Sequence, residues 1–244
     1  MKKSICLGLF ILIIVSSCMK DSSLSDVEIS DPSLIRPDIS LTRTRDNSNR
    51  LETDIKVFLW DKNFDAVQLK KGSVSVNGNI MKVDKLVLTG APYYTIDTTV
   101  LRVELNKTCT FIIELADGQQ YEASITTQNV DLYELNLPSG YSKLNNMDIS
   151  WKGSEIQNEF EILLTCNYSA DSESGQTSDL FTPNYQERLS GTYIISKSYF
   201  NQKDNIYKAS VKISSKKNGT IDPVFRSGAT IYSYYEKISE CNVN

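Results

Sequence analysis

Residues 207–214 read YKASVKIS, a strict alternation of apolar and polar side chains. In an extended chain, successive side chains point to opposite faces, so this stretch has one apolar and one polar face. Its apolar face carries Tyr207, Ala209, Val211 and Ile213. A period of two is typical of a β-strand that lies between a core and solvent. The stretch therefore predicts a β-sheet protein.

The same period recurs on both sides of this stretch. It is found at residues 73–76, 101–105, 121–125 and 160–166. Three dipeptides that accept the positive φ angles of tight hairpins lie between these runs: Asn77-Gly78, Asp117-Gly118 and Asn218-Gly219. The sequence has no long amphipathic helical pattern. Many short strands joined by tight turns predict an all-β, antiparallel sandwich or barrel.

The chain divides near residues 129–138, where Pro138 and Gly140 interrupt the alternation. We expect an N-terminal β-sandwich domain over residues 50–130 and a C-terminal one over 138–244. The second half resembles immunoglobulin-like and fibronectin type III-like modules. There, MDISW (147–151) is similar to an early strand with a core tryptophan, and ATIYSYYEKIS (229–239) to the closing strand.

The first residues predict a secretory signal peptide. Lys2 and Lys3 precede an apolar run over 5–15, followed by Ser16, Ser17 and Cys18. This order is that of a secretory signal, and the run is shorter than the ~20 residues of a membrane-spanning helix. Residues 15–18 resemble a bacterial lipobox. The resemblance implies cleavage of the signal peptide (1–17) and lipidation of Cys18. Residues 18–49 are rich in Ser, Asp and Arg without a sustained period, which predicts a tether or linker, with one edge strand at its end as an open alternative.

The lipobox and the tandem β modules together resemble cell-envelope lipoproteins of Bacteroidota. This resemblance implies a lipid anchor in the bacterial outer membrane and carries no catalytic residues with it. Lys20 and Asp21 favour exposure at the cell surface, and the periplasmic side stays open as an alternative.

Composition excludes several functions. The formal net charge is −4, which argues against nucleic acid as a partner. The chain has no histidine, which excludes Ser-His-Asp and Cys-His catalysis and histidine-ligated metals. Glu159 and Glu161 share a strand face, but exposed sheets commonly carry such pairs. We therefore expect no enzymatic activity, no cofactor and no metal.

Asp61, Asn63 and Asp65 have the spacing of a calcium loop, but Ala66 and Gly72 replace its turn glycine and bidentate glutamate. A plain turn is favoured there. An acidic stretch at 169–179 could supply a looser calcium site, and a disordered surface loop is the preferred interpretation.

Three cysteines follow Cys18. Cys109 is in phase with apolar neighbours, which indicates a buried thiol. Cys166 and Cys241 lie in the second half and are candidates for a disulfide, a pairing that the sequence leaves open.

Aromatic residues supply the candidate ligand contacts, which are Tyr232, Tyr234 and Tyr235. In a strand, Tyr232 and Tyr234 share one face and Tyr235 takes the other, so part of this group belongs to the core. The triplet over 97–99 fits a short bacterial O-glycosylation pattern with Thr98 as the acceptor.

These features predict a lipid-anchored, non-enzymatic binding or structural module of the cell envelope, with a protein or a glycan as its partner. The alternative is an accessory lipoprotein that captures polysaccharide for an uptake system. An exposed aromatic platform would favour the glycan, and an apolar patch or unpaired strand edge would favour a protein.

Overall fold

The computed structural model describes residues 28–46, 48, 50–101, 103–128, 134–152, 159–170, 173–181, 190–200 and 205–244. The fold is all β, with 59% strand and 4% helix, as the alternation predicts. Among the described residues, the helical segments are η2 (Pro32–Leu34) and α1 (Lys197–Phe200), both short.

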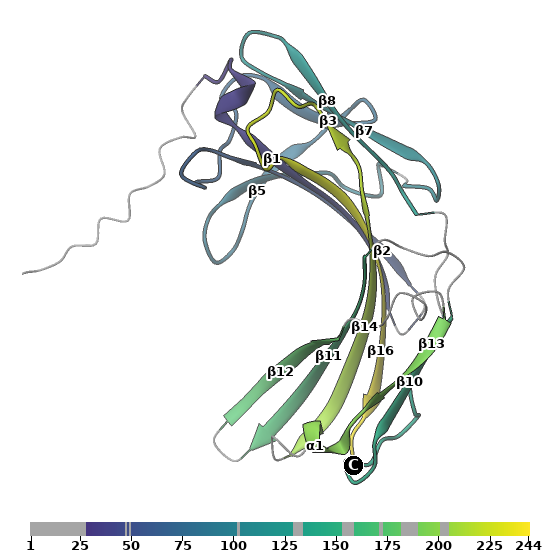
Figure 1. The fold of residues 1–244 in the computed structure, drawn as a ribbon. Coiled ribbons are helices and arrows are strands. Elements are labelled where there is room, and N and C mark those ends of the chain that lie inside the picture. The colour runs from purple at the N-terminus through teal and green to yellow at the C-terminus, as the bar shows by residue number, and fades with distance from the viewer. Residues whose placement is uncertain are drawn as a thin grey trace, which may run out of the picture.

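One large sheet runs the length of an arched molecule, and a smaller sheet lies at each end (Figure 1). In order, the large sheet consists of β12 (Glu173–Phe181), β11 (Glu159–Ala170), β14 (Ile206–Asn218), β16 (Thr230–Asn242), β1 (Arg36–Arg45), β2 (Leu51–Trp60), β6 (Pro92–Thr95) and β5 (Lys82–Lys85). Adjacent strands in this sheet are antiparallel, except that β1 and β16 are parallel to each other.

The smaller sheets each cover part of the large one. The first consists of β15 (Thr220–Ile221), β8 (Gln120–Thr126), β7 (Thr108–Glu114), β3 (Ser73–Val76) and β4 (Asn79–Ile80). The second consists of β13 (Ser190–Ile195), β10 (Met147–Lys152) and β9 (Glu134–Asn136). Each encloses a hydrophobic core against the large sheet, which is the layering of a β-sandwich.

Both cores use the same face of β16. Ile231 lies in the first core, and Tyr235 and Cys241 lie in the second. These residues have the same parity along one strand, so the two smaller sheets cover one face of the large sheet. Trp151 is 3% exposed in the second core, as predicted.

The domain boundaries differ from those expected from the sequence. Residues 129–133 lie outside the described residues, but Phe225 and Ile231, from the second half, pack into the first core. The two halves are therefore joined by a shared sheet, because β14 and β16 extend from one core toward the other.

The second part of the segment 18–49, expected to be a tether with at most an edge strand, is an interior strand of the large sheet. Residues 36–45 form β1, an interior strand between β16 and β2. Its side chains alternate in burial, and Ile39 and Leu41 are completely buried in the first core. Burial of this apolar face fixes the segment in the sheet.

The prediction of a strand at 101–105 is wrong. Leu101 is buried, but it ends a turn in which the amides of Val100 and Leu101 donate to the Asp97 carbonyl at 2.9 and 3.3 Å. The other four stretches lie in strands: β14, β3, β8 and β11.

Candidate functional site

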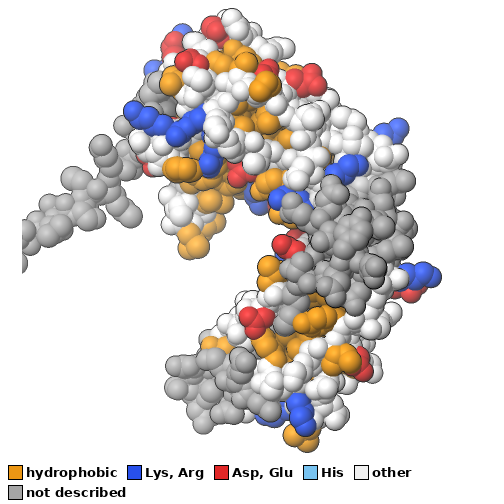
Figure 2. Space-filling view, viewed as in Figure 1, with side chains coloured by type: hydrophobic (Ala, Val, Ile, Leu, Met, Phe, Trp, Pro, Cys, Tyr) orange, Lys and Arg blue, Asp and Glu red, His pale blue; other side chains and the backbone are white. Residues whose placement is uncertain are grey.

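The face of the large sheet opposite the two cores carries the candidate site, and we call it the open face. On β2, Ile55, Val57 and Leu59 are buried in the first core, so Lys56, Phe58 and Trp60 project from the open face. At the end of the arch where β1 and β2 lie, this face looks into a hollow between the two ends of the molecule (Figures 1 and 2).

Three adjacent aromatic side chains form what we call the aromatic row: Phe58, Trp60 and Tyr93. The Phe58 and Trp60 rings stack with centroids 5.2 Å apart and planes 10° apart. The Tyr93 ring lies 5.5 Å from Phe58 because β6 pairs with β2 through Val57 and Tyr94, which places Tyr93 opposite Phe58. All three side chains are partly exposed. Both centroid distances lie in the range of interacting aromatic pairs, so the row presents a continuous aromatic surface.

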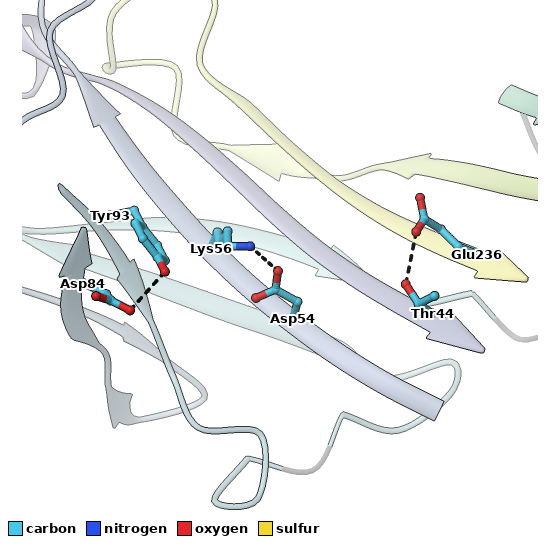
Figure 3. A network of polar contacts seen from close by, with 6 residues as sticks. All are labelled: Thr44, Asp54, Lys56, Asp84, Tyr93 and Glu236. Atoms are coloured by element: carbon cyan, nitrogen blue, oxygen red, sulfur yellow. Dashed lines mark hydrogen bonds and ion pairs between the residues drawn. The ribbon is translucent and has the colours of Figure 1, made fainter. Parts of the chain in front are cut away.

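Charged and polar side chains border the aromatic row (Figure 3). Lys56 forms an ion pair with Asp54, and its Nζ lies 5.8 Å from the centre of the Tyr93 ring. The Tyr93 hydroxyl donates to Asp84 Oδ2 at 3.1 Å. Partial burial raises the pKa of Tyr93, and this hydrogen bond adds to the rise. The surface therefore offers ammonium donors and carboxylate acceptors beside aromatic faces.

A second polar cluster follows along the open face. Thr44 Oγ1 donates to Glu236 Oε2 at 3.1 Å (Figure 3). Lys212 Nζ forms an ion pair with Glu236 Oε1 at 2.7 Å. These contacts join β1, β16 and β14 from the side opposite the cores.

Two of the three predicted tyrosine contacts lie on the open face. The rings of Tyr232 and Tyr234 are 5.0 Å apart at 66°, and Lys216 Nζ lies 5.2 and 5.8 Å from their centres. Burial raises the pKa of Tyr232 to about 12, and the nearby Asp38 carboxylate adds to the rise. Tyr232 is opposite Ser40, which is opposite Lys56, so this pair lies two strands, or roughly 10 Å, from the aromatic row.

The prediction that Tyr235 contacts a ligand is wrong. It is completely buried in the second core, on the face opposite Tyr232 and Tyr234. Arg45 Nε donates to its hydroxyl at 3.2 Å, and the Arg43 guanidinium lies 5.6 Å from its ring. The residue is a packing residue, because the core excludes it from any ligand on the open face.

The candidate disulfide is also corrected. Cys166 and Cys241 are both buried and free. Cys166 pairs with Ala209, and Ala209 pairs with Cys241, so one strand separates the two thiols. Their Cα atoms are roughly 10 Å apart by strand spacing, beyond the reach of a disulfide. Burial raises the pKa of Cys166 to about 12, and Cys241 adds to the rise. Cys109 is buried and free, as expected.

The remaining candidates lie away from the aromatic row. Thr98 is partly exposed in the turn after β6 and lines a shallow depression of about 420 Å³ together with Leu101 and Val103. Cys18 and the signal peptide lie outside the described residues. So does the side chain of Glu159, which shares a strand face with Glu161 in the sequence.

The candidate calcium loop is a turn. Asp61 Oδ1 accepts the backbone amides of Asn63 and Asp65 at 2.7 and 2.9 Å. The acidic stretch at 169–179 mainly contributes to β11 and β12, which corrects the disordered loop expected there. Among the described residues, no group of three or more His, Cys, Asp or Glu could hold a metal ion.

Sequence reasoning missed the aromatic row. The run IKVFLW at 55–60 is apolar on both faces apart from Lys56, and such a strand buries one face and needs a partner for the other. Tyr93 lies 33 positions after Trp60, and only the register between β2 and β6 brings it to Phe58.

No protein-family model and no curated protein matches the chain. Among solved structures, it is similar to the adhesin InvE of Yersinia pseudotuberculosis, at 9% sequence identity and a TM-score of 0.22. The match covers 87% of this chain and 60% of that one. A similarity at this level supports no statement about fold or function. Within the part of the chain that the structure describes, no helix is long and apolar enough to cross a membrane.

Proposed function

We propose that this chain is a lipid-anchored protein of the bacterial outer membrane that binds a glycan on the open face and catalyses no reaction. The aromatic row is the observation that carries this proposal. Aromatic faces pack against the C–H faces of sugar rings, and the sugar hydroxyls then need donors and acceptors at the rim. Lys56, Asp54 and Asp84 supply these groups directly beside Phe58 and Tyr93.

The shape of the surface supports a polymer as the ligand. An open sheet face has no walls that would limit the length of the bound molecule. The tyrosine pair on β16 lies on the same face as the aromatic row, so one polysaccharide chain could contact both. This arrangement favours capture of a polysaccharide over binding of a small molecule in an enclosed pocket.

The ligand is tested by glycan-array binding of the lipid-free chain, followed by dissociation constants for variants. We expect Phe58→Ala and Tyr93→Ala to weaken binding about threefold to tenfold each, because each removes one aromatic contact. Tyr207→Ala is the matched control, since Tyr207 is 54% exposed and lies beside Val243 at the end of β14 that packs in the second core, remote from β2. An array without any bound glycan, or an equal loss in the control, would contradict the proposal.

The anchor is tested separately by membrane fractionation and protease treatment of intact cells. We expect the wild type to pellet with outer membranes and to be degraded from outside, and Cys18→Ala to leave the membrane fraction. A Cys18→Ala variant that stays in the membrane would rule out the lipid anchor. Protection of the wild type until lysis would place the binding face in the periplasm.

A further inference from the structure

The edge strand β5 has backbone groups available for another strand. The Leu86 amide donates to the Ala91 carbonyl at 3.0 Å, which marks 86 and 91 as a bonded pair of the β5–β6 hairpin. Because bonded pairs alternate, Asp84 is bonded to β6, and the amides of Val83 and Lys85 point away from it. Asp84 Oδ1 accepts the Lys85 amide at 2.7 Å. The Val83 amide and carbonyl therefore lie at the outer edge of the large sheet.

The hairpin that follows β5 has an exposed apolar tip. Val87 and Leu88 are 100% and 96% exposed. The hairpin projects into the hollow of the arch, and apolar side chains are visible at its end (Figures 1 and 2). Single exposed apolar residues are ordinary, but two fully exposed neighbours on a tight hairpin indicate a contact surface.

An apolar depression lies at the other end of β5. It has a volume of about 390 Å³ and is lined by Gly78, Asn79, Ile80, Lys82, Ile96, Asp97 and Val100. Ile80 and Val100 are 72% and 68% exposed. The edge strand is thus flanked by an apolar projection at one end and an apolar depression at the other.

We propose that β5 pairs antiparallel with β5 of a second copy of this chain, with Val83 on the two-fold axis. Val83 then exchanges both backbone hydrogen bonds with Val83 of the second copy, which uses the outward groups of both strands. The large sheets continue into each other, with both open faces on the same side.

Charge selects this register. Lys82 and Asp84 are both on the open face, and with Val83 on the axis each Lys82 faces an Asp84 of the second copy. An axis between 83 and 84 would instead place Lys82 against Lys85, and an axis at 84 would oppose two carboxylates. Lysines on a short edge strand normally discourage pairing, whereas here Asp84 of the second copy compensates Lys82.

The same register brings the apolar surfaces together. Residues 86–88 of one copy are directed toward residues 78–80 of the other, so each exposed tip meets the depression of its partner. Both contacts occur twice across the axis, as a two-fold interface requires. The dimer would present two binding faces side by side, which strengthens attachment to a repetitive polymer. The pairing uses only the sheet edge, so this proposal does not depend on which ligand the aromatic row binds.

The test is a charge exchange followed by analytical ultracentrifugation of the full-length, lipid-free chain. We expect the wild type to be dimeric and Lys82→Glu and Asp84→Lys each to be monomeric. Mixing the two variants should restore a dimer, because every facing pair then carries opposite charges. Lys107→Glu, at an exposed lysine outside β5, should stay dimeric.

A further variant tests the backbone pairing independently of charge. Val83→Pro removes only the outward amide, so we expect β5 to keep its bonds to β6 and the dimer to dissociate. A wild type that is monomeric up to its solubility limit would overturn the proposal. So would single variants that stay dimeric, or a mixture that does not associate.

Discussion

Gln128 shows how one buried polar side chain joins parts of the fold. It is completely buried just after β8, and its Nε2 donates to the Ser233 carbonyl at 2.8 Å. In return, Ser233 Oγ donates to Gln128 Oε1 at 2.7 Å. These bonds fix the end of β8 to the first half of β16, between Ile231 of the first core and Tyr235 of the second.

We predict that Gln128→Leu lowers the free energy of unfolding by about 2 kcal/mol, since it leaves the buried Ser233 hydroxyl and carbonyl without their partner. Urea denaturation measures the change. Gln176→Leu serves as the control, because Gln176 is exposed on β12. An equal effect of the two substitutions would mean that the buried bonds contribute nothing to stability.

At single positions, alternation predicts which residues of a strand share a face, but not which of the two faces is buried. It correctly places Tyr232 and Tyr234 on one side of their strand and Tyr235 on the other. Which side is covered depends on where the second small sheet packs, and the sequence contains no local signal for that. For the same reason, the sequence places Cys166 and Cys241 in the same half of the chain, but it does not predict that a third strand, β14, lies between their two strands.

At the scale of elements, Gly219 determines how β15 can pair with β8. The sequence predicts a tight turn at Asn218-Gly219, but neither residue has a positive φ. Instead, the chain passes from β14 into β15, which pairs with β8. A Cβ atom at position 219 would lie 2.2 Å from the Ser124 carbonyl oxygen. The glycine is therefore required by the close approach of two backbones rather than by a turn.

We predict that Gly219→Ala destabilises the protein by about 2 kcal/mol or more, because the clash is with backbone and forces β15 away from β8. Gly140→Ala is the control, since the atom nearest to a methyl group at that position would be 3.8 Å away, and we expect a change within about 0.5 kcal/mol. Thermal denaturation of both variants measures the difference. Similar melting temperatures would show that β15 adapts without cost.

Whole strands were predictable where one face is polar. In β14 and β8, polar residues on one side set a clear period of two. Residues 101–105 have the same period without forming a ladder, because burial of Leu101 in a turn satisfies the same pattern. Conversely, β1 was not predicted as an interior strand, since its position depends on pairing with β16 almost two hundred positions later.

At the scale of the molecule, the sequence predicts the all-β class and misses how the two halves connect. The interruption near 129–138 is real in composition, but the strands on both sides of it enter one sheet. Sheet order is a long-range property, and alternation along one strand is the same whether its neighbours come from its own half or from the other.

The shared sheet predicts that both cores unfold together. β16 contributes Ile231 to the first core and Tyr235 to the second, so loss of either core disturbs a strand of the other. Trp60 reports on the first half and Trp151 on the second. We expect a single cooperative transition in urea, in which the fluorescence of either tryptophan follows the loss of β structure.

Trp60→Phe and Trp151→Phe isolate the two signals. In each variant, the fluorescence midpoint is compared with the far-ultraviolet circular dichroism midpoint of the same variant, which removes the effect of the substitution on overall stability. Coincident midpoints in both variants indicate one folding unit. A fluorescence midpoint that separates from the dichroism in either variant would mean that the two halves unfold as independent domains in spite of their common sheet.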